Sequence, residues 1–332
     1  MKKNEMKITL TRIASTLIVC LLLWVCISGL GFIVRPTDTD GAYSQVETFH
    51  SLPKNSIEVM IYGSSHAYRG VSTMKMYDEY GIGAYNYGWH WQKANTTNLF
   101  LKDSLEKQTP RVVLIEACLL GSVLKNTNIT AEIYYTRYLH NNSAKMDYLK
   151  QCFGTDIERY LSFFMPLCAF HDNWNTLTST SFTSLSVNPG LRRSMGFSMS
   201  NAVKEVEIPD YRRFVQKEYT RDAENEILDM IHTCHEKGIQ VVFFTVPWEG
   251  EFAYGNAIRK LAKENDCAYL DLFESMEEIG IDGKTDFSDS GHLNTSGAEK
   301  VAVYLGKYIV ENYDVTDMRT IENNLWTMAK QQ

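Results

Sequence analysis

The sequence predicts a doubly wound α/β sandwich, in which helices cover both faces of a central parallel sheet, preceded by a membrane-spanning helix. Short, almost purely apolar segments alternate with longer amphipathic ones over residues 57–117 and again over 222–312. This alternation is typical of strands that are buried on both faces of a parallel sheet. The chain has 332 residues, which suffices for one large domain or two small ones.

The N-terminal segment predicts the membrane anchor. Residues 13–34 form a run of 22 residues without a charge, between Arg12 and Arg35. A run of this length can cross a bilayer as a helix, and it lacks a convincing small-x-small cleavage site, so we expect it to be retained. The residues before it are mostly basic: Lys2, Lys3, Lys7 and Arg12, against Glu5. The positive-inside rule then places the N-terminus in the cytoplasm and the remainder outside the cell membrane.

Charge and cysteine content narrow the function classes. Residues 1–35 carry five Lys/Arg and one acid, net +4, whereas the remainder carries 28 basic and 39 acidic residues, net −11. A domain with this negative charge is a poor candidate for binding nucleic acid or an anionic lipid surface. The five cysteines outside the anchor lack metal-ligand spacing, and their odd number argues against a full disulfide framework. A disulfide between Cys152 and Cys168 remains an alternative.

The expected elements follow in order along the chain. Strands are predicted over residues 57–62, 84–87, 111–117, 239–246 and 268–272, and helices over 73–80, 93–107, 222–237, 252–265 and 296–312.

The expected domain boundaries follow from these elements. A cytoplasmic stub and anchor (1–35) and a linker (36–55) precede one domain over 56–315, and a C-terminal helix covers 316–332. An insertion at about 120–216 begins aromatic and helical and ends rich in Ser, Thr, Asn and Gly. We expect it to pack over the carboxyl edge of the sheet, where such folds bind ligands.

The first candidate for chemistry is Ser65, in the stretch GSSH that follows the first strand. A serine at the start of a helix has backbone amides that point outward, and its own amide can stabilise a developing oxyanion. The alternative is that Ser64 or Ser65 only caps the next helix.

The second candidate is the stretch DFSDSGH near the C-terminus, which contains Asp289 and His292. Three residues apart, their side chains can lie on one side of a turn. A carboxylate on imidazole Nδ1–H fixes the tautomer and leaves Nε2 free to accept a serine proton. The alternative is a polar loop in which Asp289 caps the following helix, although Asn294 or Thr295 suits that role better.

Together the two stretches resemble the SGNH (GDSL-type) hydrolase superfamily, over roughly residues 57–118 and 239–313. The resemblance implies that Ser65 is the nucleophile, His292 the base and Asp289 the acid, with the amides of Ser65 and Gly88 as oxyanion donors. Two positions depart from the family pattern. Ser64 replaces an Asp, and Glu116 stands where an Asn donor is expected, although an ionised Glu cannot donate to an oxyanion.

Within this superfamily the chain resembles membrane-anchored proteins of cell-envelope acylation, such as the teichoic-acid D-alanylation accessory protein and alginate acetylation proteins. The resemblance implies an extracytoplasmic serine esterase or O-acyltransferase that acts on acyl esters of an envelope glycan, beside a membrane-bound O-acyltransferase. The alternative is a weak or inactive SGNH-like protein that binds a glycan or serves as a scaffold for such a transferase. No cofactor and no metal are expected.

Further residues are candidates for supporting roles. Asn86 and His66 lie next to the predicted strand ends and could orient the site. Aromatic faces can stack on sugars and Arg can pair with phosphate, although aromatic residues more often pack in the core. The candidates for substrate contact are Trp89, His171, Trp174, Arg192 and Arg193. The His232-x-x-His235 pair is predicted to be a solvated helix face rather than a metal site.

Overall fold

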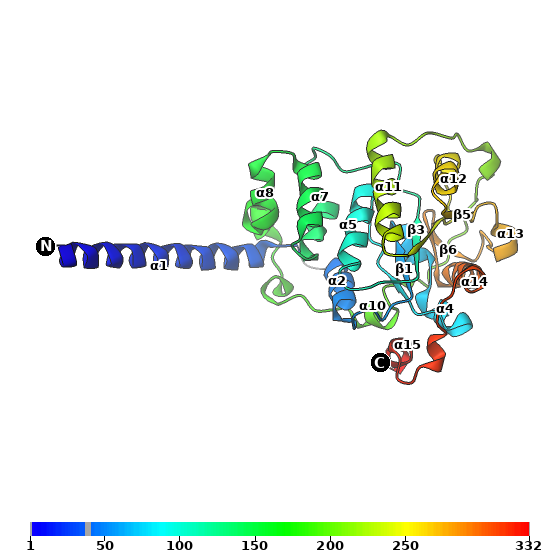
Figure 1. The fold of residues 1–332 in the computed structure, drawn as a ribbon, viewed down its shortest axis with the longest axis horizontal. Helices are drawn as coiled ribbons and strands as arrows, with labels where there is room; N and C mark the ends of the chain where they lie inside the picture. Colours follow the sequence, from blue (N-terminus) through cyan, green and yellow to red (C-terminus); the bar gives the residue numbers. More distant parts are fainter. Residues whose placement is uncertain (1, 37–40, 332) are drawn as a thin grey trace. The chain divides into compact units, whose positions relative to one another are not determined.

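A computed structural model describes residues 2–36 and 41–331. The chain divides into two compact units. Unit 1 comprises residues 1–39, 128–137 and 155–185, and unit 2 comprises residues 40–127, 138–154 and 186–332. Figure 1 labels the elements of both units.

Unit 2 is built on a five-stranded sheet of order β2-β1-β3-β4-β5, in which every neighbouring pair is parallel. The strands are β1 (Val59–Tyr62), β2 (Ala84–Asn86), β3 (Val112–Glu116), β4 (Gln240–Thr245) and β5 (Ala268–Asp271). All five lie within the ranges predicted from sequence. Because β2 and β3 flank β1 on opposite sides, the strand order reverses there, and the carboxyl ends of β1 and β3 face the crevice where such sheets bind ligands.

Helices cover both faces of the sheet, which confirms the doubly wound α/β class (Figure 1). On one face α4 (Thr73–Tyr80) packs against α14 (Thr295–Asn312), and on the other α5 (Ala94–Ser104) packs against α11 (Arg221–His235). The next helix, α12 (Gly255–Glu264), contacts β5. All five were predicted. Strands β1 to β4 are almost completely buried, which explains their apolar sequences, whereas the edge strand β5 is half-buried.

The predicted linker over residues 36–55 is wrong where the structure describes it, because α2 (Ala42–Ser51) forms there. Val46 and Phe49 are buried, and the Phe49 ring stacks on Tyr87 with centroids 4.4 Å apart. Several polar residues of α2, including Ser44, Gln45 and Thr48, are buried, and this polar composition made the segment resemble a linker in the sequence. Residues 37–40 of that predicted linker lie outside the described residues.

The predicted C-terminal helix begins later than residue 316. A 3₁₀ turn (η5, Met318–Thr320) precedes α15 (Leu325–Gln331), whose Trp326 is fully buried and donates its indole N–H to the Ala84 carbonyl at 3.0 Å. The last residue, 332, lies outside the described part of the chain.

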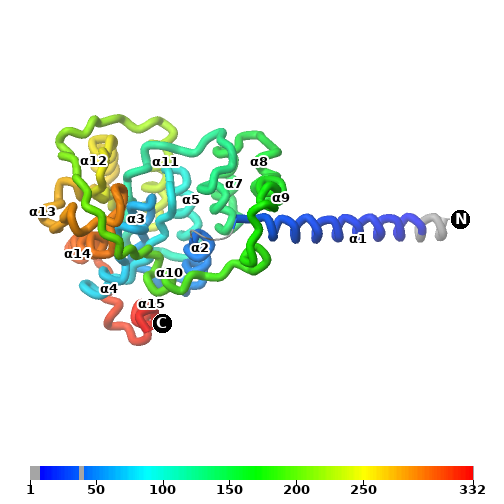
Figure 2. Tube along the Cα trace, turned by 180° about the vertical axis from the view of Figure 1, so that it is seen from behind, coloured from blue at the N-terminus to red at the C-terminus, as the bar shows by residue number. Residues whose placement is uncertain are grey.

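The second half of the predicted insertion contacts α3, which follows β1, and the strand β6. After α10 (Pro189–Arg193), the Ser198 N–H donates to the Tyr68 carbonyl at 2.8 Å. Further on, the Lys204 N–H donates to Phe287 at 2.9 Å. Figure 2 shows this segment passing α3 and α14 before it reaches α11. The remaining elements of unit 2 are α3 (Ser65–Gly70), α7 (Ser143–Phe153), α13 (Met276–Ile279), the hairpin strands β6 (Phe287–Asp289) and β7 (His292–Leu293), η1 (Thr136–Tyr138, which begins in unit 1) and η4 (Tyr211–Arg213).

Unit 1 contains the first helix, α1 (Lys2–Val34), and part of the predicted insertion. Residues 8–34 of α1 are long and apolar enough to cross a membrane. Side chains along α1 such as Leu17, Leu21 and Trp24 are about 60% exposed, so unit 1 leaves most of this helix uncovered. The other elements of unit 1 are α6 (Ala131–Tyr135), α8 (Ile157–Phe164), α9 (Pro166–Phe170), η2 (His171–Thr176) and η3 (Ser179–Phe182). Cys168 carries a free thiol, so the disulfide with Cys152 is not formed.

Candidate active site

The turn after β1 places Ser65 at the first position of α3. Gly63 has φ 136°, and a Cβ at this position would lie 2.6 Å from the Glu116 Cβ, so only glycine lets the turn pass β3. Ser64 is the N-cap of α3, and its Oγ accepts from the His66 N–H at 3.3 Å. The capping role therefore falls to Ser64, which leaves the Ser65 hydroxyl available for another contact.

The hairpin of β6 and β7 supplies the other two predicted residues. Asp289 and His292 face each other as a pair across this antiparallel hairpin. Asn294, not Asp289, caps α14, and its side chain accepts from the Gly297 N–H at 3.1 Å. Asp289 is therefore free of the capping role that was its alternative.

The three residues form a continuous chain of hydrogen bonds. His292 Nε2 lies 2.7 Å from Ser65 Oγ, and His292 Nδ1 lies 2.7 Å from Asp289 Oδ1. The Gly291 N–H also donates to Asp289 Oδ1, at 2.9 Å, which fixes the carboxylate. Ser65, His292 and Asp289 thus have the mutual geometry that a Ser-His-Asp triad requires.

Arg69 completes this arrangement, and sequence reasoning missed it. Its guanidinium lies 3.2 Å from Asp289 Oδ2 and donates to Ser288 Oγ at 2.8 Å. Because Arg69 lies one turn after Ser65 on α3, its side chain links the helix that bears the nucleophile to the hairpin that bears the acid and base. The only sequence signal was the four-residue spacing from Ser65.

The electrostatics favour a neutral base and an ionised acid. Partial burial and the nearby Arg69 charge lower the pKa of His292 below 6.5, although Asp289 opposes this. Partial burial raises the pKa of Asp289, but the hydrogen bonds from His292 and Gly291 and the charges of His292 and Arg69 bring it below its usual value. At neutral pH His292 is therefore ready to accept a proton while Asp289 holds its Nδ1–H.

We expect ester hydrolysis by these residues to be lost as the pH falls and His292 becomes protonated. Because the lowered pKa keeps His292 neutral below pH 6.5, kcat/KM for an aryl ester should fall to half its plateau at a pH below 6.5. Arg69→Gln removes a charge that lowers this pKa, so its acid limb should move to higher pH. A wild-type midpoint above 6.5, or an unmoved limb in the variant, would contradict this assignment.

Behind the nucleophile, Glu116 at the end of β3 replaces the expected Asn. Its side chain is fully buried, accepts from Ser64 Oγ at 2.8 Å and accepts from the Cys118 N–H at 2.7 Å. Burial raises the pKa of Glu116 to about 7, although the hydrogen bonds from Ser64 and Cys118 lower it. The two departures from the family pattern, Ser64 and Glu116, are thus hydrogen-bonded partners that brace the turn.

This burial gives Glu116 a measurable effect on stability. Its pKa is about 7 in the folded protein and 4.5 ordinarily, so the folded state binds its proton more tightly. Stability is therefore lost as pH rises from 4.5 to 7. Between pH 5 and pH 8 we expect the unfolding free energy of the wild type to fall by about 2–3 kcal/mol relative to Glu116→Gln, which does not titrate. Denaturant unfolding followed by tryptophan fluorescence measures this difference, and parallel pH profiles for the two proteins would refute it.

The two predicted oxyanion donors, the N–H groups of Ser65 and Gly88, differ in their hydrogen bonding. Within the described part of the chain, the Ser65 N–H has no hydrogen-bond partner, whereas the Gly88 N–H donates to Asn86 Oδ1 at 3.1 Å. Asn86 Nδ2 in turn donates to the Ala67 carbonyl at 2.9 Å. A Cβ at Gly88 would lie 3.1 Å from the Ala67 Cβ and the Gly63 carbonyl, so this loop packs tightly on the Ser65 turn. Asn86 thus positions the loop, and the Gly88 N–H becomes a donor only when it leaves Asn86.

Aromatic rings surround the site. The buried His66 ring lies 4.7 Å from the Trp248 ring and 5.6 Å from that of His292, and burial, with the nearby His292, lowers the pKa of His66 to about 3. Trp89 is buried and stacks on Tyr68, so it serves as packing for α3. Trp91, three residues after Gly88, is 60% exposed in a left-handed conformation with φ 57°. An exposed bulky residue held in this backbone region marks a strained loop.

The other predicted substrate contacts are spread over both units. His171 and Trp174 belong to unit 1, where both are largely exposed, and His171 lies 3.3 Å from Asp172. Arg192 and Arg193 lie exposed on α10 of unit 2, and this helix packs against α2 and α15. None of the four is brought into the hydrogen-bonded chain of Ser65, His292 and Asp289.

Comparisons with known proteins add distant likenesses. No protein-family model and no curated protein matches the chain. Among solved structures, it is similar to a presumed acylhydrolase from Bacteroides fragilis, at 12% identity and a TM-score of 0.38, over 80% of this chain and 94% of that one. It is also similar to a GDSL-like lipase from Bacteroides thetaiotaomicron, at 12% identity and a TM-score of 0.37, over 81% and 97% of the two chains. Inferences about the site therefore rest on its own geometry.

Proposed function

We propose that the protein is a serine esterase or O-acyltransferase that uses Ser65, His292 and Asp289. The observation that carries this proposal is the pair of 2.7 Å contacts from His292, one to Ser65 Oγ and one to Asp289 Oδ1. A serine that only caps a helix does not need an imidazole on its hydroxyl. An imidazole in a polar surface loop does not need a carboxylate behind it.

The proposed reaction has two steps, in which Ser65 first receives the acyl group and then transfers it. Ser65 Oγ attacks the acyl carbonyl carbon, its proton passes to His292 Nε2, and the Ser65 N–H donates to the oxygen that gains negative charge. The tetrahedral intermediate then collapses, the ester C–O bond breaks, and the leaving alcohol takes the proton from His292. In the second step His292 Nε2 takes a proton from a water or an acceptor hydroxyl, whose oxygen attacks the acyl carbon. The bond from that carbon to Ser65 Oγ then breaks, and Ser65 regains its proton from His292.

We further propose that the substrate is an acylated cell-envelope glycan, reached from a single-pass anchor with the N-terminus in the cytoplasm. Three features support this. Residues 8–34 of α1 can cross a membrane, the chain after residue 35 is acidic, and the exposed Trp91 beside Gly88 offers a face on which a sugar ring can stack. A membrane-bound O-acyltransferase is the proposed partner that supplies or receives the acyl group.

A fluorophosphonate probe tests the proposal directly. The detergent-solubilised full chain should form a covalent adduct, and digestion followed by mass spectrometry should place it on Ser65. The matched control is Ser64→Ala, which keeps the Ser65 hydroxyl and should still be labelled. An adduct at another residue, or none, would overturn the nucleophile assignment.

A second candidate is a glycan-binding scaffold without turnover, favoured by two observations. Glu116 offers no amide in place of the expected Asn, and the Gly88 N–H is already bound to Asn86. A chain with Ser65, Asp289 and His292 all replaced distinguishes the two. A scaffold would still restore a deletion strain, whereas an enzyme would not.

A further inference from the structure

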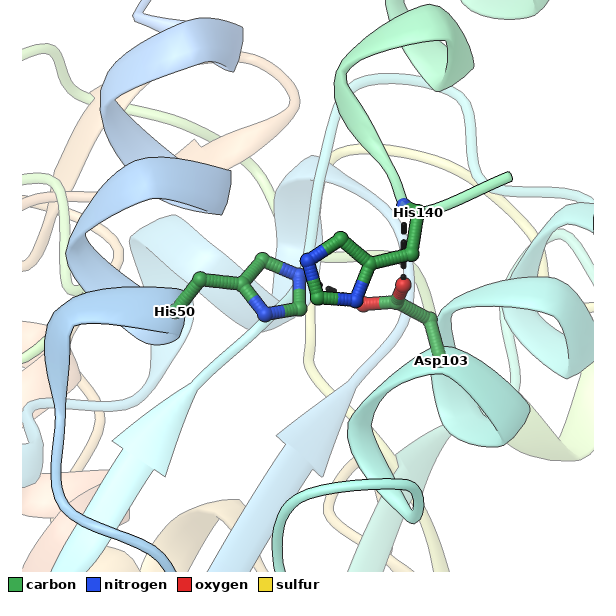
Figure 3. Close-up of side chains that lie close together, drawn as sticks. All are labelled: His50, Asp103 and His140. Carbon is green, nitrogen blue, oxygen red and sulfur yellow. Dashed lines mark hydrogen bonds and ion pairs between the residues drawn. The ribbon is translucent and has the colours of Figure 1, made fainter. Parts of the chain in front are cut away.

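A second cluster of chemically active side chains lies outside the candidate active site. It consists of His50 in the last turn of α2, Asp103 in the last turn of α5, and His140 just before α7, all in unit 2 (Figure 3). The spacings along the chain are 53 and 37 residues, so no local motif announced the cluster.

The ligand atoms of these residues are close together. His50 Nε2 lies 3.0 Å from Asp103 Oδ2, and one ligand atom from each of the three residues lies within 4.8 Å of the others. The two imidazole rings face each other with centroids 4.0 Å apart, and Figure 3 shows both beside the carboxylate. Ligand atoms around a tetrahedral zinc are about 3.4 Å apart, because Zn–N and Zn–O bonds are about 2.0–2.2 Å. The His140 side chain is exposed, so solvent reaches this side of the cluster.

The buried negative charge of Asp103 also favours a bound cation. The Asp103 side chain is fully buried, and among the described residues its one ion-pair partner is His50. Its other contacts are neutral: the Tyr87 hydroxyl at 3.0 Å and the His140 backbone N–H at 3.3 Å. Buried carboxylates are normally paired with a cation or bound to a metal ion. The Tyr87 and backbone contacts hold the carboxylate in a fixed orientation, as partners of metal-binding carboxylates do.

We propose that His50, Asp103 and His140 bind a divalent transition-metal ion of the zinc class. Two imidazoles and one carboxylate suit Zn²⁺ and its neighbours, whereas Ca²⁺ and Mg²⁺ require mainly oxygen ligands. Three protein ligands leave a fourth position for water at the exposed His140 side. The ion would connect α2, α5 and the segment before α7.

Zinc titration of the chelator-treated full chain in detergent tests the site. Isothermal titration calorimetry should find one Zn²⁺ per chain, and thermal unfolding should shift upward with added zinc. His140→Gln removes a ligand whose side chain is exposed, and we expect it to weaken zinc binding at least about tenfold. Asp103→Asn should weaken it further.

The matched control is His232→Gln. His232 is an exposed imidazole that also lies beside a carboxylate, 3.1 Å from Glu236, but among the described residues it belongs to no group of three close candidate ligands. Zinc binding and the thermal shift should be unchanged in this variant. The proposal is overturned if the wild type binds no zinc, or if His140→Gln binds it as tightly as the wild type. In that case the cluster is a hydrogen-bonded packing contact.

Discussion

Ser65→Ala should reduce the hydrolysis of an activated aryl ester by about four to six orders of magnitude in kcat. The reason is the 2.7 Å contact between Ser65 Oγ and His292 Nε2, which has no substitute once the hydroxyl is gone. Initial rates measured with purified full chain in detergent give the effect.

Two controls distinguish the loss of the nucleophile from a loss of folding. Circular dichroism and thermal unfolding should show that Ser65→Ala folds like the wild type, since Ser65 is only half-buried at the first position of α3 and Ser64 provides the helix cap. Ser64→Ala should retain most of the activity. A folded Ser65→Ala protein with more than about a hundredth of the wild-type rate would exclude Ser65 as the nucleophile.

Asp289→Asn should lower kcat by about three to four orders of magnitude with little change in KM. An amide in this position can present its NH₂ group to His292 Nδ1 and stabilise the tautomer whose proton faces Ser65. Nε2 would then be unable to accept the serine proton. The ratio of kcat to KM effects, measured with the same aryl ester, separates this cause from a loss of substrate binding.

The neighbouring Ser288 supplies the control for this prediction. Ser288→Ala removes a partner of Arg69 from the same strand but leaves the contact between Asp289 and His292 in place. Its rate should stay within about tenfold of the wild type. If Asp289→Asn were equally active, Asp289 would be a structural residue and the hydrogen-bonded chain would end at His292.

Much of the fold could be predicted because its signals are local. The buried strands of a doubly wound sheet are short and apolar, and the turn at Gly63 and the pair Asp289 and His292 are visible within a few residues. The contacts that depend on residues far apart could not be predicted in this way. Arg69 reaches Asp289 across 220 positions, and Ser64 reaches Glu116 across 52. Nothing near either residue in the sequence indicates its partner.

The state of the oxyanion donors could not be predicted either. Gly88 lies where the resemblance implies a donor, but its N–H donates to the Asn86 side chain, which is held in place by its hydrogen bond to the Ala67 carbonyl. Similarly, α2 was read as a linker because its apolar residues face inward to a core that is assembled from distant parts of the chain. In both cases tertiary packing decided what local composition left open.

The replacement of the expected linker by α2 limits where the protein can act. Only residues 35–41 separate the end of α1 from the start of α2, and even fully extended they span at most about 25 Å. If α1 is the membrane anchor, as proposed, unit 2 begins within about 25 Å of the end of the membrane-spanning helix. Its accessible substrates would then be those in the innermost layer of the envelope, selected by distance from the membrane before any pocket selects them by shape.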